Sequence, residues 1–128
     1  MMASITHIAL YSKDIEKSRE YYITYFGGKS NELYRNDKGF SSYFLTFGSG
    51  ARLEIMSHVE LNEYKVADKT NGWNHIAFSV GDKETVLELT NRIVSDGYEL
   101  LSPPRVTGDG YFESCVADPD GNRVEITV

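Results

Sequence analysis

Two histidines and two glutamates recur at matching places in the two halves of the chain. His7 and His75 each precede Ile-Ala in a short strand-like run, and Glu54 and Glu125 each stand between two aliphatic residues. The two histidines are 68 residues apart and the two glutamates are 71 residues apart, so the separations are nearly equal. This indicates one duplicated unit, with a His on its first strand and a Glu on its last.

Two imidazoles and two carboxylates form a suitable ligand set for a borderline divalent cation. Side chains alternate along a strand, so the aliphatic neighbours of each Glu would pack on a helix while the Glu faces the other way. A carboxylate inside a sheet is costly unless it is paired or bound to a metal. The alternative is a solvated second face, on which each of these residues is an ordinary polar position. Solvation does not explain why both residue types recur in both repeats.

The composition excludes several classes of protein. The chain has 128 residues, is 41% hydrophobic and carries a formal net charge of −6, without a cluster of basic residues. We expect a folded protein with neither a nucleic-acid nor a membrane partner. No apolar run approaches membrane-spanning length, the N-terminus does not read as a signal peptide, and we expect a soluble, cytoplasmic protein. The single cysteine, Cys115, is expected to be a small buried strand residue.

The periodicity of the first half predicts the order β-α-β-β-β. The first strand ends before Ser12 or Asp14, either of which can cap the following helix, and Gly27-Gly28 ends that helix. The turn signals Asn36 to Gly39 and Gly48 to Gly50 separate the later strands. The predicted elements are a strand at 5–11, a helix at 15–26 and strands at 30–36, 40–47 and 51–57.

The second half repeats this order after a polar linker at 58–72. Its helix begins near Asp82 and stops at Asp96-Gly97, and Pro103 and Pro104 are expected to end the strand that follows. The predicted strands are 73–80, 98–102, 111–117 and 122–128. We therefore predict an α+β fold made of two βαβββ modules, 1–57 and 73–128, within a single domain 1–128. The helices should lie on the convex faces of curved mixed sheets.

Four further polar residues are weaker candidates for contacts with a substrate. Arg52 shares a strand face with Glu54, and His58 follows that strand. Arg105 is expected in the loop before Gly108. If Asp118 to Gly121 forms a four-residue turn, Ser114 would lie opposite Glu125. Each of these residues is also explained by an ordinary exposed or structural role.

Taken together, these features resemble the vicinal oxygen chelate superfamily, which includes glyoxalase I, bleomycin-resistance proteins, fosfomycin-resistance thiol transferases and extradiol dioxygenases. The resemblance covers essentially the whole chain. The closing run Asp118-Pro119-Asp120-Gly121-Asn122-Arg123-Val124-Glu125-Ile126 is similar to a signature of that superfamily. The set His7, Glu54, His75 and Glu125 most resembles the metal ligands of glyoxalase I.

The resemblance implies a lyase or isomerase that uses Ni, Co or Zn on a small vicinal-oxygen substrate, such as the hemithioacetal of a 2-oxoaldehyde and a thiol. Proton transfer would pass through a metal-stabilised enediolate, with Glu125 as the base and Glu54 assisting. Glutathione or another thiol would be the cosubstrate, and a homodimer is expected. The alternatives are a metal-free binding protein of the bleomycin-resistance type and a thiol transferase of the fosfomycin type.

Two positions depart from the glyoxalase I pattern. Glyoxalase I enzymes typically place an arginine four residues after the first His to hold glutathione, and this chain has Tyr11 there. They also carry an asparagine shortly after the second ligand, where this chain has Ser57-His58. The metal ligands are therefore matched more fully than the glutathione site.

Overall fold

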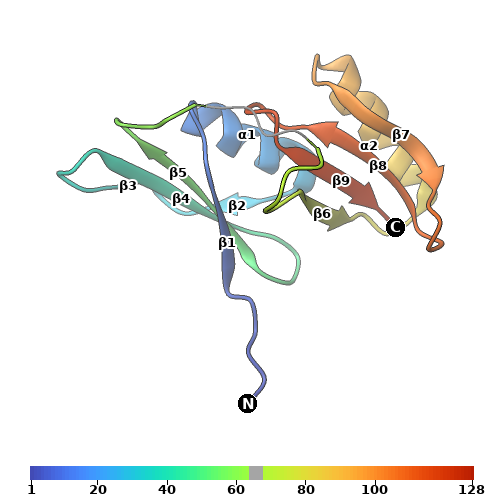
Figure 1. Ribbon diagram of the computed structural model, residues 1–128, viewed down its shortest axis with the longest axis horizontal. Coiled ribbons are helices and arrows are strands. Elements are labelled where there is room, and N and C mark those ends of the chain that lie inside the picture. The colour runs from blue at the N-terminus through green and yellow to red at the C-terminus, as the bar shows by residue number, and fades with distance from the viewer. Residues whose placement is uncertain (64–67) are drawn as a thin grey trace. The chain divides into compact units, whose positions relative to one another are not determined.

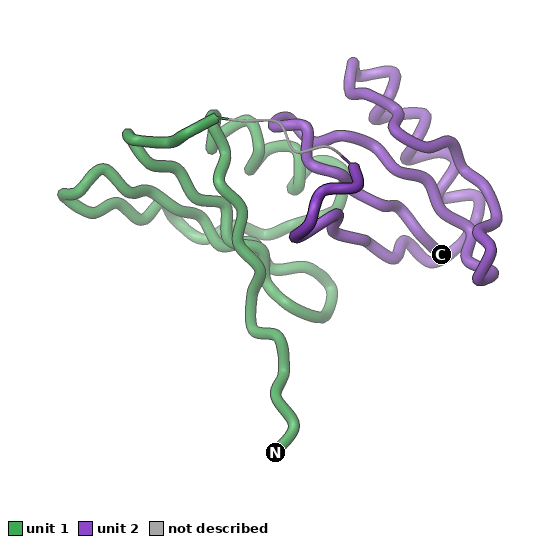
Figure 2. Tube along the Cα trace, in the orientation of Figure 1, with its two compact units in different colours: residues 1–64 green, residues 65–128 purple. Residues whose placement is uncertain are grey.

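The computed structural model describes residues 1–63 and 68–128. The chain divides into two compact units, Met1–Tyr64 and Lys65–Val128 (Figure 2). Each unit begins with a strand, continues into a helix and ends with antiparallel strands (Figure 1). The predicted α+β class is confirmed. Neither helix in the described ranges is long and apolar enough to cross a membrane.

In its described residues, unit 1 holds one sheet covered by one helix. The sheet order is β1-β5-β4-β2, and β3 also pairs with β4. The edge strand β1 runs parallel to β5, whereas β4 is antiparallel to β5. The elements are β1 (His7–Tyr11), α1 (Ile15–Phe26), β2 (Lys29–Ser30), β3 (Tyr34–Arg35), β4 (Phe40–Thr46) and β5 (Arg52–His58).

Helix α1 starts and stops where local chemistry satisfies its end groups. Asp14 is the N-cap, and its side chain accepts a hydrogen bond from the Lys17 amide at 3.1 Å. Gly27 ends the helix at φ 69°, a left-handed conformation that glycine adopts without a Cβ clash. The helix packs on β4 and β5. The fully buried side chains of this core are Tyr21, Tyr22, Leu45, Leu53 and Ile55.

The described part of unit 2 repeats this plan with the sheet order β6-β9-β8-β7. The edge strand β6 runs parallel to β9, and Asp82 caps the helix through the Thr85 amide at 2.8 Å. The helix packs on β7, β8 and β9, over a core that includes Val86, Ile93, Val116, Val124 and Ile126. The elements are β6 (His75–Ser79), α2 (Lys83–Ser95), β7 (Leu100–Val106), β8 (Phe112–Ala117) and β9 (Arg123–Thr127).

Two predicted strands differ from those observed. The strand expected at 30–36 is two short strands, β2 and β3, because the Asn31 side chain accepts a hydrogen bond from the Phe44 amide at 2.8 Å and interrupts the ladder. The strand expected to stop at Pro103 instead continues to Val106. A register shift between Ser102 and Arg105 spans the two prolines, and β7 is an edge strand, where a missing backbone N–H is tolerated.

A register error places Ser114 on the wrong face in the sequence prediction. The β8–β9 connection spans 118–122, one residue longer than expected, so Cys115 rather than Ser114 lies opposite Glu125. The buried Asp118 carboxylate holds this loop by accepting hydrogen bonds from the amides of Asp120 at 2.9 Å and Asn122 at 2.8 Å. Ser114 turns toward the helix instead.

Candidate functional site

Each of the two predicted histidine and glutamate pairs comes together within its own unit. The Nε2 atom of His7 lies 3.8 Å from Oε1 of Glu54, and Nε2 of His75 lies 3.3 Å from Oε2 of Glu125. In both units the His is on the edge strand and the Glu is on the parallel neighbour, two residues beyond the residue that pairs with the His. The duplicated sequence therefore produces the same local pair twice.

The aliphatic residues beside each Glu explain why the carboxylates face away from the helices. Leu53, Ile55, Val124 and Ile126 are all buried at 2% exposure or less. Since alternate residues of a strand point to opposite faces, burying these four under α1 and α2 fixes the direction of Glu54 and Glu125. The predicted face assignment of the two glutamates is confirmed. On the edge strand β1 the rule is weaker, because Ile8 remains 38% exposed.

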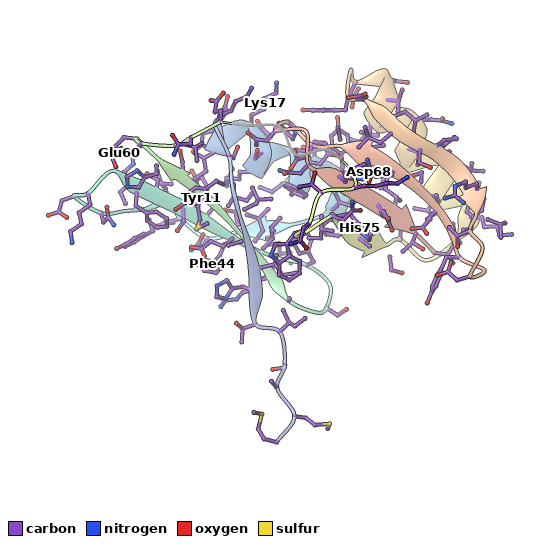
Figure 3. All side chains as sticks on the ribbon, in the orientation of Figure 1. Tyr11, Lys17, Phe44, Glu60, Asp68 and His75 are labelled. Atoms are coloured by element: carbon purple, nitrogen blue, oxygen red, sulfur yellow. The ribbon has the colours of Figure 1, made fainter. Side chains whose placement is uncertain are left out.

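An aromatic and cationic group surrounds the pair in unit 1. The ring of Phe44, opposite Glu54 in the β4–β5 register, meets the His7 ring edge to face with centroids 5.3 Å apart. The guanidinium of Arg52 lies over the same Phe44 ring, 4.6 Å from its centroid. Figure 3 labels Phe44 and also Tyr11, which is half exposed at the end of β1. Arg52 thus shares the face of His7 and Glu54, as predicted.

Charged groups surround the pair in unit 2, and one of them escaped the sequence analysis. Burial, followed by a hydrogen bond that the protonated Glu125 donates to Glu113 and by the Glu113 charge, raises the pKa of Glu125 from 4.5 to about 7. Arg123 and Arg105 act in the opposite direction. Glu113 lies on the same strand and face as Cys115, so the one-residue register error had hidden it. The correct register would have revealed it by simple alternation.

The remaining predicted residues take defined places. Arg105 lies in β7 opposite Glu113, not in a loop. His58 is the last residue of β5, and its Nδ1 accepts a hydrogen bond from the Glu60 amide at 3.0 Å. Ser114 is buried and lies 2.7 Å from the Thr90 hydroxyl, away from Glu125. Cys115 is buried as expected, and burial raises the pKa of its thiol.

The ring nitrogens of the two histidines are arranged in a way that suits metal ligation. Nδ1 of His7 lies 3.0 Å from the Thr6 hydroxyl, and Nδ1 of His75 lies 2.7 Å from Oδ1 of Asn74. Ligating histidines usually engage their second ring nitrogen in this way. Each unit supplies two donor side chains. Within 1–63 and 68–128, no cluster of three or more His, Cys, Asp or Glu side chains is positioned to hold a metal ion.

A family model for the Glyoxalase/Bleomycin resistance protein/Dioxygenase superfamily matches residues 4–126. The chain belongs to this superfamily. Its curated relatives include two Bacillus subtilis proteins described only as uncharacterized. YwkD is 28% identical over 89 residues, 69% of this chain and 70% of its own length. YqjT is 27% identical over 132 residues, 94% of each chain.

Solved structures of the superfamily share this fold. A glyoxylase/bleomycin resistance protein/dioxygenase domain from Frankia sp. has a TM-score of 0.84 at 18% identity, covering 100% of this chain and 98% of its own. The trypanothione-dependent glyoxalase I of Leishmania major has a TM-score of 0.78 at 22% identity, covering 98% of this chain and 86% of its own. Glyoxalase I from Zea mays has a TM-score of 0.79 at 24% identity. The match covers 97% of this chain and only 44% of the maize chain. The superfamily fold predicted from the sequence is confirmed.

Proposed function

We propose that the protein is a metal-dependent lyase or isomerase of the glyoxalase I type. Its substrate would be a small vicinal-oxygen compound, such as the hemithioacetal of a 2-oxoaldehyde and a thiol. The observation that carries the proposal is the repeated pair, in which a histidine Nε2 lies 3.8 Å or 3.3 Å from a carboxylate oxygen on the neighbouring parallel strand. Superfamily membership and the fold shared with glyoxalase I support it.

The donor types fit a borderline divalent cation, and we assign His7, Glu54, His75 and Glu125 as its ligands. Imidazole nitrogen and carboxylate oxygen together suit Ni, Co or Zn. In both histidines Nδ1 is already engaged by the preceding side chain, which leaves Nε2 for the metal. When bound, the metal would polarise the substrate oxygens as a Lewis acid.

The protein's own contribution would be proton transfer by Glu125. In the metal-free protein, burial together with Glu113 raises the pKa of Glu125 to about 7, and a bound cation would lower it again. Glu125 would take a proton from the carbon beside the carbonyl and return it to the adjacent carbon, with Glu54 assisting. Glu54 keeps 14% of its side chain exposed, a partly buried setting that limits competing water.

The thiol and the assembly follow from the same proposal. Tyr11 replaces the arginine that glyoxalase I enzymes typically use for glutathione, so either glutathione or another thiol is the proposed cosubstrate. Arg52 adds a cation on the face of His7 and Glu54 that could meet an anionic group of the substrate. The protein would act as a homodimer, since members of the superfamily often complete their cavities by pairing modules within or between chains.

The deciding experiment compares metal content per chain in wild type, His75→Gln, Glu125→Gln and Glu88→Gln, each purified without added metal or chelator. Glu88 is an exposed residue of α2 and provides the matched control. We expect near-stoichiometric Ni, Co or Zn in wild type and in the control, and a loss in the two site variants. Hemithioacetals of methylglyoxal with glutathione and with other thiols would then be assayed. A wild type that binds none of the three metals on reconstitution would replace this proposal with a small-molecule binding function.

A further inference from the structure

Both ring nitrogens of His75 have a neighbour. Nδ1 lies 2.7 Å from Oδ1 of Asn74, and Nε2 lies 3.3 Å from Oε2 of Glu125. A neutral imidazole carries its hydrogen on one nitrogen and a lone pair on the other. The position of that hydrogen therefore decides whether Nε2 can bind a cation. The contacts of Asn74 favour one of the two positions.

The orientation of the Asn74 amide follows from its contacts with Asp68, which is labelled with His75 in Figure 3. The Nδ2 atom of Asn74 lies 2.8 Å from the Asp68 backbone carbonyl and 3.1 Å from Asp68 Oδ1. Both of these oxygens only accept hydrogen bonds. Turning the amide over would place three oxygens together, so the NH₂ group must face Asp68 and Oδ1 must face the histidine.

This orientation fixes the histidine tautomer. An amide oxygen can only accept, so the 2.7 Å contact requires the hydrogen to be on Nδ1 of His75. The lone pair then lies on Nε2, on the side of Glu125. A free histidine side chain in water favours the opposite tautomer, with hydrogen on Nε2, so the preference has to be imposed by the protein.

Asp68 is in turn held from the strand that carries Glu125. Nε of Arg123 lies 3.4 Å from Asp68 Oδ1, and within the described residues this buried nitrogen forms no hydrogen bond. Arg123 lies opposite His75 in the β6–β9 register. The contacts therefore form a chain of side chains, Arg123–Asp68–Asn74–His75–Glu125, whose two ends both lie on β9.

The equivalent histidine of unit 1 lacks this arrangement. Nδ1 of His7 lies 3.0 Å from the Thr6 hydroxyl, which can donate or accept. The Thr6 contact is compatible with either tautomer of His7. Both repeats carry the histidine, but only the contacts of His75 select one position for the ring hydrogen. His7 therefore serves as an internal control for His75.

We propose that Asn74 and Asp68 are positioning residues that hold His75 as the Nδ1–H tautomer and present the Nε2 lone pair for ligation. The value of that lone pair as a metal ligand rests on the proposed function. The tautomer itself does not, because the contacts that fix it are all between side chains and backbone of unit 2.

The test is the two-bond proton–nitrogen NMR spectrum of ¹⁵N-labelled protein in chelator. It is recorded about two pH units above the ordinary histidine pKa of ~6.5, so that the rings are neutral. The Glu125 carboxyl, with a pKa of about 7, is then ionised and favours a hydrogen on Nε2, so an Nδ1–H ring under these conditions shows that the Asn74 contact prevails. The His75 signals are assigned by their loss in His75→Gln. We expect wild-type His75 to be the Nδ1–H tautomer and Asn74→Ala to shift it toward Nε2–H. A wild-type Nε2–H ring, or a tautomer unchanged in Asn74→Ala, overturns the inference.

Matched variants separate positioning from a general disturbance. Thr6→Val should change the His7 signals and leave His75 as in wild type. Asp68→Ala should shift the His75 tautomer toward Nε2–H less than Asn74→Ala does, because the backbone carbonyl of Asp68 remains. Asp68→Asn keeps an acceptor oxygen and should shift the tautomer least. Asn74 is exposed, so its truncation opens no cavity, and circular dichroism confirms the fold. A His75 shift in Thr6→Val as large as in Asn74→Ala would contradict the assignment.

Metal affinity, measured by competition of Ni²⁺ between protein and a chromogenic chelator, connects the tautomer to ligation. Loss of a group that orients a ligand typically costs about 10–100-fold in affinity, and we expect a loss of that order in Asn74→Ala. A wild type without Ni²⁺ affinity defeats the proposed function while leaving the tautomer result intact. A wild type that binds Ni²⁺, with an unaltered affinity in Asn74→Ala, defeats the positioning role alone.

Discussion

Glu113 and Glu125 lie diagonally across the β8–β9 pair, and a hydrogen bond between them helps to keep Glu125 protonated. Two carboxyl groups in contact cannot both ionise cheaply, so one retains its proton to a higher pH. Burial is the larger cause, and together they bring the pKa of Glu125 to about 7. A second acid from the neighbouring strand thus tunes the proposed base.

Glu113→Gln should lower the pKa of Glu125. The substitution removes the negative charge, and the new amide donates a hydrogen bond that favours the ionised form of Glu125. The pKa should fall from about 7 toward 4.5 without reaching it, because burial remains. The measurement is a ¹³C NMR titration of the carboxyl in metal-free protein, with Glu88→Gln as the control. An unchanged or higher pKa in Glu113→Gln would show that the two carboxyls do not interact.

The metal-free protein should lose stability as the pH rises from about 4.5 to about 7. Over this range the folded state keeps the Glu125 proton while the unfolded chain releases it, so the folded state binds more protons. The stabilisation is complete below the unfolded pKa and is gone once the pH has passed the folded pKa. Tm measured in chelator should therefore decline less steeply over this window in Glu125→Gln than in wild type. Parallel curves would contradict the raised pKa.

Asp118→Ala should destabilise the protein by about 2–4 kcal/mol, the effect expected from losing hydrogen bonds to a charged group and leaving amides unpaired. Asp118 is 3% exposed, and its carboxylate accepts from two backbone amides and from Nδ2 of Asn122 at 2.9 Å. Asp118→Asn keeps one acceptor oxygen and should lose less. Urea denaturation provides the measurement, and equal losses in the two variants would exclude the hydrogen bonds as the cause.

Ile126→Ala should cost about 2–5 kcal/mol, as for other large-to-small substitutions in a packed core. Ile126 is fully buried at 0% exposure, beside Glu125 on the opposite face of β9. Ile5→Ala is the matched control, since Ile5 is 70% exposed and should change the free energy of unfolding by less than about 0.5 kcal/mol. Similar losses for the two variants in urea denaturation would mean that the face assignment of β9 is wrong.

The duplicated pattern and the local capping residues were enough to predict the strand faces of the two glutamates and the starts of the two helices. Alternation around Glu54 and Glu125 was enough to predict their faces, because strong aliphatic burial on one side leaves only one register. The helix boundaries followed from Asp14 and Asp82, whose side chains cap in a purely local way. Such features depend on neighbours in the sequence, and local patterns determine them.

Features that depend on a loop conformation or on distant contacts were missed. The β8–β9 connection is one residue longer than its turn motif suggests, because Asp118 bonds the Asn122 amide, and this moved Ser114 off the site face and Glu113 onto it. The contact of Asn74 with Asp68 crosses a loop and has no periodic signal. The division of 30–36 depends on the Asn31 side chain pairing with Phe44. None of these is encoded in residue spacing alone.

The prolines of β7 also restrict how the unit 2 sheet can grow. The outer edge of that sheet carries Pro103 and Pro104, which offer no backbone N–H to an incoming strand. The opposite edge, β6, contains no proline. Addition of a strand from a second molecule is therefore disfavoured at the β7 edge and directed to the edge that carries His75, which protects the protein from open-ended stacking through this sheet.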